Sequence, residues 1–240
     1  MHTSVTAQKK DRRFWKAALH FFAVTAIIIA VPVLSVLADD EMMLVIDPGH
    51  GGLDGGAVSV TGTAESGINL AISQKLLALA RLYGMQAILT RDRETLDYPD
   101  DTGSIHEKKV WDQKRRADLI NGCGSAVLFS VHQNNYPDRR PNGTQVFYGR
   151  AEGSEELGKL LHENLVRCLC PDNRRVAAPI SEKLYLFKSV HCPSVLIECG
   201  FLSNPGDASL LRSEDYRTAL SVTITAACIG CAEELKSVYG

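Results

Sequence analysis

The chain has 240 residues, of which 45% are hydrophobic and 22% are charged, and its formal net charge is −2. This length and balance suit one soluble α/β domain with some residues to spare. The near-neutral charge excludes a strongly basic protein, so we expect no nucleic-acid partner.

The spare residues lie at the start of the chain. The basic stretch KKDRRFWK precedes residues 17–38, which contain no formally charged side chain apart from the titratable His20. A stretch of this length can span a bilayer and exceeds the usual core of a secretory signal, about 7 to 15 residues. We therefore expect residues 1–16 to be a cytoplasmic N-terminus, residues 17–38 to be a membrane anchor, and the rest to be exported. A cleaved signal peptide is the alternative, because Val36 and Ala38 are small enough for a signal-peptidase site.

Apolar runs and helical periodicity then alternate along residues 42–240, which we interpret as one domain. Turn-bounded apolar runs predict strands at 43–47, 85–90, 126–132, 145–148 and 195–198. The first predicted helix starts near Gly67 and has an apolar face of Ile68, Ile72, Leu76, Leu79 and Leu82; others are predicted at 110–121, 154–168 and 215–235. This alternation predicts an α/β fold with a mainly parallel sheet flanked by helices on both faces.

A histidine stands among glycines directly after the first predicted strand, in LVIDPGHGG at residues 44–52. Because Gly49, Gly51 and Gly52 have no Cβ, the backbone there can take positive φ and let another group approach closely. Spacing argues against a dinucleotide-binding loop, since the third glycine of G-x-G-x-x-G would fall on Asp54. An imidazole at the carboxyl end of a strand can instead be a metal ligand, provided that it has partners.

Three further side chains are expected at the same edge of the sheet. His132 ends the third predicted strand, and Glu198 ends the last one. Glu65 lies just ahead of the first predicted helix. With His50, they make two imidazoles and two carboxylates, the inventory of a catalytic zinc site with three ligands and a separate acid/base.

Each residue also has a structural interpretation. The two histidines can be satisfied loop residues, and Glu65 can be a carboxylate that stabilises a helix N-terminus. Glu198 is harder to explain in this way, because a buried, ionised and unpaired carboxylate costs several kcal/mol.

Four motifs, in this order, carry a family resemblance: VIDPGHGGLDGGA, ESGINLAIS, FSVHQN and VLIECGFLSN. They resemble the zinc-dependent N-acetylmuramoyl-L-alanine amidases of bacterial cell walls, over nearly all of residues 42–236. The resemblance implies a twisted sheet flanked by helices and peptidoglycan as the substrate. It also implies Zn²⁺ held by His50, Glu65 and His132, with Glu198 as the catalytic glutamate that moves a proton from water to the departing amine.

The short, anchored build and the stretches SVHQN and NGTQVFY resemble in particular the spore-cortex amidases, which remove the peptide from muramic acid so that muramic lactam can form. This implies action at the outer face of the cytoplasmic membrane, in the cell wall or in the forespore intermembrane space, with an activating protein partner left open. Two positions depart from the family pattern; they concern loop geometry and substrate contacts, and neither removes a ligand. Gly55 stands where proline is common, and Ser66 where a basic residue is common.

Asn134 and Arg116 are the candidate substrate contacts. A strand-end turn and a solvated helix face are the alternative interpretations of these two residues. Two competing functions remain: a noncatalytic wall-binding protein, against which the retained Glu198 argues, and another zinc hydrolase such as a deacetylase of wall sugars, against which the motif order argues. A Ser-His-Asp hydrolase is disfavoured because no G-x-S-x-G motif is present.

Overall fold

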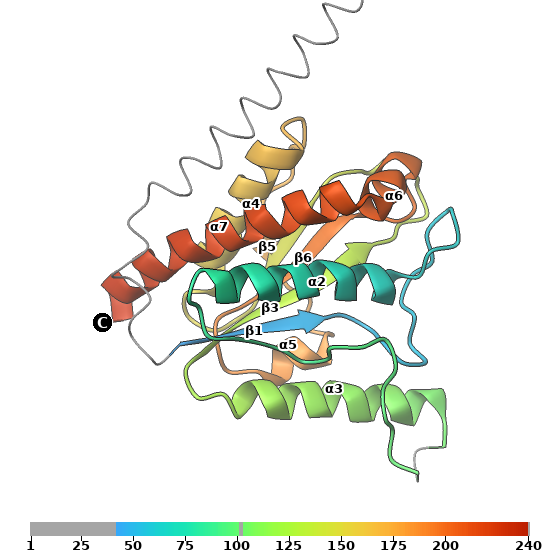
Figure 1. The fold of residues 1–240 in the computed structure, drawn as a ribbon, viewed down its shortest axis with the longest axis horizontal. Helices are drawn as coiled ribbons and strands as arrows, with labels where there is room; N and C mark the ends of the chain where they lie inside the picture. The colour runs from blue at the N-terminus through green and yellow to red at the C-terminus, as the bar shows by residue number, and fades with distance from the viewer. Residues whose placement is uncertain (1–41, 101–102, 240) are drawn as a thin grey trace, which may run out of the picture. The chain divides into compact units, whose positions relative to one another are not determined.

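Figure 1 shows the computed structural model, which describes residues 42–100 and 103–239. The predicted N-terminal segments, residues 1–16 and 17–38, lie outside the described residues. In the part that is described, no helix is both long and apolar enough to cross a membrane.

Six strands of the described chain form one sheet in the order β2-β1-β3-β6-β4-β5. Four of them run parallel: β1 (Met43–Pro48), β2 (Ala87–Leu89), β3 (Ala126–Asn134) and β6 (Ser194–Phe201). At the other edge, β4 (Gln145–Tyr148) pairs antiparallel with β6, and β5 (Ala178–Pro179) pairs parallel with β4. The predicted mainly parallel sheet is confirmed. The second strand is shorter than predicted, and β5 was not predicted.

Helices cover both faces of this sheet (Figure 1). One face packs against α2 (Glu65–Leu82), α4 (Ser154–Leu169) and α7 (Glu214–Tyr239). The opposite face packs against α3 (Ile105–Asn121) and α5 (Tyr185–Ser189). The short helix α6 (Pro205–Arg212) joins β6 to α7. The three layers are those that the alternating pattern predicts.

Two core clusters result from the alternation of side chains along the strands. Ile46 and Ile197 are buried against the α2 face, whereas their neighbours Val45 and Leu196 are buried against α3 and α5. Because each face is covered, the central strands are continuous apolar runs. Their carboxyl ends form a single edge, where the predicted functional residues stand.

Two helices begin earlier than their apolar periodicity predicts. The first turn of α2 starts at Glu65, because the Glu65 N–H donates to the Ala57 carbonyl at 2.8 Å in the preceding loop. The start of α3 is set by a capping box, in which Ser104 accepts from the Glu107 N–H and Glu107 accepts from the Ser104 N–H. At the far end of α2, Leu82 is 77% exposed and does not belong to the core face that periodicity predicts.

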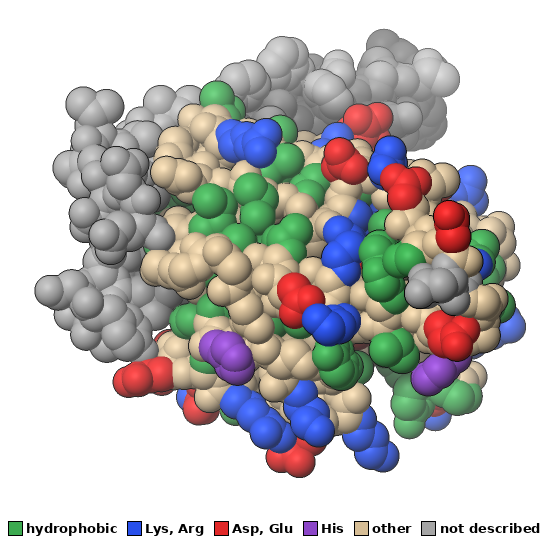
Figure 2. Space-filling view, turned by 90° about the horizontal axis from the view of Figure 1, so that it is seen from below, with side chains coloured by type: hydrophobic (Ala, Val, Ile, Leu, Met, Phe, Trp, Pro, Cys, Tyr) green, Lys and Arg blue, Asp and Glu red, His purple; other side chains and the backbone are tan. Residues whose placement is uncertain are grey.

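Figure 2 shows the molecule from the side on which α3 lies in Figure 1. Lys and Arg side chains are mixed there with Asp, Glu and apolar ones. On α3, Lys114 Nζ lies 2.6 Å from Asp118 Oδ2, and both side chains are largely exposed. Such surface pairs contribute little to stability, typically about 0 to 1 kcal/mol. Substitution of Lys114 is therefore expected to change the stability of the protein very little, and it can serve as a control.

Candidate functional site

His50 follows β1 by two residues and has a φ of 60°, the only positive φ of a non-glycine residue in the described part of the chain. This left-handed conformation costs roughly 1 to 2 kcal/mol. Two hydrogen bonds to the backbone hold this conformation. The Gly49 N–H donates to the Val131 carbonyl at 3.0 Å, and the Arg116 guanidinium donates to the His50 carbonyl at 2.5 Å. The segment of residues 48–56, which we call the His50 loop, is thereby fixed with the imidazole at the edge of the sheet.

Two glycines leave the space that the functional side chains occupy. A Cβ on Gly49 would lie 2.2 Å from His132 Nε2. A Cβ on Gly56 would lie 2.6 Å from Glu65 Oε2. Gly49 and Gly56 are therefore required by close approach, and Gly56 is also required by its positive φ of 69°.

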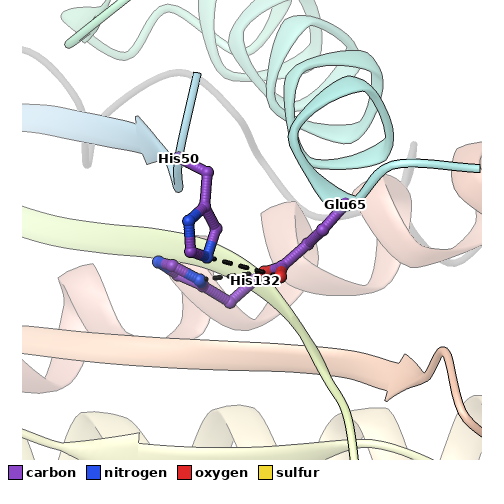
Figure 3. Close-up of side chains that lie close together, drawn as sticks. All are labelled: His50, Glu65 and His132. Atoms are coloured by element: carbon purple, nitrogen blue, oxygen red, sulfur yellow. Dashed lines mark hydrogen bonds and ion pairs between the residues drawn. The ribbon is translucent and has the colours of Figure 1, made fainter. Parts of the chain in front are cut away.

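Glu65 stands between the two imidazoles (Figure 3). Its Oε1 lies 3.1 Å from His132 Nδ1, and its Oε2 lies 3.3 Å from His50 Nε2. Burial raises the pKa of Glu65, but the hydrogen bonds to His132 and His50 outweigh burial and lower it well below the usual range. The Gln133 N–H also donates to Oε1, and the Ala57 N–H donates to Oε2. The carboxylate is therefore held as an anion in one orientation.

The structure brings the three predicted ligands together. One ligand atom each from His50, Glu65 and His132 lies within 4.8 Å of the others, a grouping that can hold a metal ion. The two imidazole rings meet edge to face, with centroids 5.0 Å apart. Two histidines and one carboxylate make a donor set that is common at catalytic zinc sites.

Glu198 lies next to this group, because β6 pairs with β3 in a register that sets Glu198 opposite His132. Its Oε2 is buried and has no hydrogen-bond partner. Burial raises the pKa of Glu198 to about 7, with a contribution from Glu65 that is opposed by His132. A carboxyl group with this pKa can both accept and donate a proton near neutral pH.

A buried polar network lies beneath the His50 loop. Asp47, 1% exposed, accepts from Arg116 Nη1 at 2.7 Å, from Thr90 Oγ1 at 2.6 Å and from Ser130 Oγ at 2.6 Å. Burial raises the pKa of Asp47, but Arg116 and the two hydroxyl donors outweigh burial and lower it to about 2. Asp47 is therefore an anion that is fully occupied by structural contacts.

Arg116 belongs to this network and does not reach the surface. Only 1% of the side chain is exposed, and its guanidinium pairs with Asp112 at 2.7 Å as well as with Asp47. It also donates to the carbonyl of Pro48 at 2.8 Å. The predicted substrate contact is inconsistent with this burial, as is the alternative of a solvated helix face. The structure places Arg116 as a support for the His50 loop.

Asn134 ends β3 and is partly exposed. The β3–β6 register shifts between His132 and Asn134, and the Asn134 carbonyl accepts from the Leu202 N–H at 2.8 Å. The predicted contact between Asn134 and substrate stays a prediction.

Sequence reasoning missed two residues that contact the His50 loop. Arg91, just after β2, donates from Nε to the Pro48 carbonyl at 2.9 Å and from Nη2 to the Gly49 carbonyl at 3.0 Å. No local pattern marks this long-range contact. Asp54 lies 3.0 Å from His50 Nδ1, and its position four residues after a candidate ligand is a signal that was visible in the sequence.

Several known proteins are similar to this chain. A family model described as N-acetylmuramoyl-L-alanine amidase matches residues 44–229. The chain is 33% identical, over 183 residues and 76% of each protein, to the germination-specific N-acetylmuramoyl-L-alanine amidase of Bacillus subtilis (strain 168). Among solved structures it is similar to the CwlD amidase of Clostridioides difficile in complex with the GerS lipoprotein, with a TM-score of 0.76 and 34% identity over 80% of this chain and 98% of that one. It is also similar to an N-acetylmuramoyl-L-alanine amidase of Clostridium difficile 630, with a TM-score of 0.69 and 26% identity over 80% and 97% of the two chains.

Proposed function

The chain belongs to the N-acetylmuramoyl-L-alanine amidase family, and we propose on this premise that it is a peptidoglycan hydrolase. The bond cleaved would be the amide between N-acetylmuramic acid and the L-alanine of the stem peptide. The observation that carries the proposal is the convergence of His50, Glu65 and His132 beside Glu198, whose buried oxygen has no partner. A protein that only binds the wall gains nothing from such a carboxylate, since an unpaired buried oxygen costs stability.

The ion that we propose for this site is Zn²⁺, held by His50, Glu65 and His132. Glu65 already orients both imidazoles, and the glycines around the loop allow the close approach that shared ligation requires. When bound, zinc would lower the pKa of a water molecule and polarise the scissile carbonyl.

Glu198 would act as the proton shuttle. Its ionised carboxylate accepts the proton of the attacking water and then donates it to the amine nitrogen of L-alanine as the amide C–N bond breaks. A pKa near 7 suits these two steps, because the group must be a base in the first and an acid in the second. Asn134, partly exposed and two residues beyond His132, remains our candidate substrate contact, since its amide can both donate and accept hydrogen bonds.

The biological setting that we propose is maturation of the spore cortex, where removal of stem peptides permits muramic lactam to form. The names of two relatives support it: one is a germination-specific amidase, and the other is the CwlD amidase. The structure of the CwlD amidase is that of a complex with the GerS lipoprotein, which supports our proposal that this chain also has an activating protein partner. Action on the wall would take place outside the cytoplasmic membrane, with residues 17–38 as the proposed attachment.

Mass analysis of digested peptidoglycan tests the reaction. The purified enzyme should release peptides that begin with L-alanine, and Glu198→Gln should reduce this release by about 10²- to 10⁴-fold while zinc content is kept. Release of acetate instead would identify a deacetylase. Near-normal activity of Glu198→Gln would overturn the proposed role of this residue.

A second experiment tests the cortex assignment. Expression in a spore former that lacks its own cortex amidase should restore muramic lactam, and the Glu198→Gln variant should not. Cleavage of purified peptidoglycan without restored lactam would contradict the cortex role and leave the amidase reaction standing.

A further inference from the structure

Asp54 contacts the Nδ1 edge of the His50 imidazole, whereas the Nε2 edge faces the candidate ligand Glu65. The Oδ2 atom of Asp54 lies 3.0 Å from His50 Nδ1. The two nitrogens of this imidazole are therefore divided between two carboxylates. A carboxylate beside Nδ1 favours a proton on that nitrogen, which leaves the Nε2 lone pair directed at the metal position.

The loop is folded so that Asp54 returns to His50. The Gly51 N–H donates to the Asp54 carbonyl at 2.7 Å, and the Asp54 N–H donates to the Gly51 carbonyl at 3.0 Å. The positive φ of His50 begins this tight turn. Asp54 is thus brought to its position by paired backbone bonds, independently of its side-chain contact with the imidazole.

The second oxygen of Asp54 is held from another element. Its Oδ1 lies 3.0 Å from Lys109 Nζ on α3, and it accepts from the Gly56 N–H at 3.2 Å. Each carboxylate oxygen therefore has its own partners, so the carboxylate cannot rotate without breaking contacts on both sides. Lys109 is half exposed, with 50% of its side chain accessible.

We propose that Asp54 is a positioning residue: it orients His50 for metal binding, and Lys109 in turn holds Asp54 in place. The inference rests on the proposed function, because it concerns the same His50, Glu65 and His132 site. Neither Asp54 nor Lys109 would touch the metal or the substrate. Contacts of this kind behind a metal-binding histidine typically raise metal affinity by about 10- to 100-fold.

Zinc competition titration of the purified full chain, with a chromophoric chelator, tests the proposal. Asp54→Ala should weaken zinc binding by about 10- to 100-fold. Lys109→Met should weaken it by a smaller factor, and Lys109→Arg should restore it, since arginine keeps the cation. The control is Lys114→Met, which breaks the exposed Lys114–Asp118 pair on the same helix and should leave the zinc dissociation constant unchanged.

A double-mutant cycle separates positioning from a general effect on the fold. If Asp54 acts through His50, adding Asp54→Ala to His50→Ala should weaken residual zinc binding no further. A merely structural role would weaken binding in either background. The visible spectrum of bound Co²⁺ gives a second readout, because loss of His50 orientation should alter the ligand field in Asp54→Ala but not in Lys114→Met.

The outcomes distinguish this inference from the proposed function. Zinc affinity unchanged in both Asp54→Ala and Lys109→Met, in a protein that loses zinc on His132→Ala, would overturn the positioning role alone. Zinc binding that is unaffected by His132→Ala would overturn the proposed site, and the inference with it. If Asp54→Ala fails to fold, the exposed Lys109→Met and Lys109→Arg pair decides the question.

Discussion

At the scale of single residues, the arrangement that supports the proposed role of Glu198 also has a cost in stability. Its Oε2 is buried without a partner, and burial raises its pKa from the ordinary 4.5 to about 7. A folded-state pKa above the unfolded value means that ionisation opposes folding. The penalty is absent below about pH 4.5, grows as the pH rises, and is complete above about pH 7.

Glu198→Gln should therefore stabilise the metal-free protein at alkaline pH. The raised pKa corresponds to as much as about 3 kcal/mol in the free energy of unfolding at about pH 8, and to almost nothing at about pH 4. Urea denaturation of both proteins at the two pH values measures the difference. An equal difference at both would show that the effect comes from packing and not from the charge.

Glu65 carries a different prediction, because its carboxylate contacts both histidines. Glu65→Gln should sharply lower zinc content, since it replaces an anionic ligand with a neutral amide that binds metal more weakly. Metal analysis of the purified protein checks this, with Glu198→Gln as the matched control that should retain about one zinc per chain. Loss of zinc in the control but not in Glu65→Gln would show that the two roles are exchanged.

The residues of the candidate cluster could be predicted from sequence because each one lies at or just beyond the end of a predicted strand, or just ahead of a predicted helix. Two of these strands are longer than predicted, since β3 continues past His132 to Asn134 and β6 continues past Glu198 to Phe201. Arg116 could not be placed in this way. Its helix has a largely polar sequence, and only the tertiary contacts of the guanidinium with Asp47 and with the carbonyls of Pro48 and His50 show that it is buried. Local pattern also gives no distance between Asp54 and His50, because that contact depends on the turn at Gly51.

At the scale of elements, α3 supports the His50 loop along one helical face. Lys109, Asp112 and Arg116 are spaced by three and four residues, which sets their side chains on the same side of the helix. Lys109 contacts Asp54, and Arg116 reaches Asp47 and two carbonyls of the loop. The helix thus supports the candidate site, while the three candidate ligands His50, Glu65 and His132 lie outside it.

Arg116→Met should lower the free energy of unfolding by about 3 to 5 kcal/mol, because it leaves the buried carboxylates of Asp47 and Asp112 without their cation. Arg116→Lys should recover only part of this loss, since an ammonium group lacks the planar fork that reaches several acceptors. Chemical denaturation measures both variants, with Lys114→Met expected to change stability by less than about 1 kcal/mol. Full recovery by lysine would show that charge alone is required.

The starts of α2 and α3 show why element boundaries were predicted less well than the elements themselves. Apolar periodicity marks the buried middle of a helix, whereas the first turn is fixed by partners for its free N–H groups. For α2 those partners are the loop carbonyls of Gly55 and Ala57, and the apolar periodicity of the helix does not reveal them. The earlier start matters, because it makes Glu65 the first helical residue and directs its carboxylate at the two histidines.

At the scale of the whole molecule, sheet order decides which strand ends meet. β3 lies between β1 and β6, so His50, His132 and Glu198 come from three adjacent parallel strands. The sequence predicted a parallel sheet and its functional edge, but not this order, because strand pairing joins segments far apart in the chain. The antiparallel direction of β4 was likewise beyond the local pattern.

The last prediction concerns export, which stays untested because residues 1–41 lie outside the described residues. Basic residues precede the apolar stretch 17–38, and the long domain follows it, so the positive-inside rule predicts that the domain crosses the membrane. Alkaline phosphatase, which folds only outside the cytoplasm, should be active when fused after residue 40. A cytoplasmic reporter such as β-galactosidase should be inactive at the same position, and the reverse pattern would contradict export. The mass of the exported product then separates the two alternatives, since an anchored chain keeps residues 1–38 in the membrane fraction whereas a cleaved one begins at Asp39.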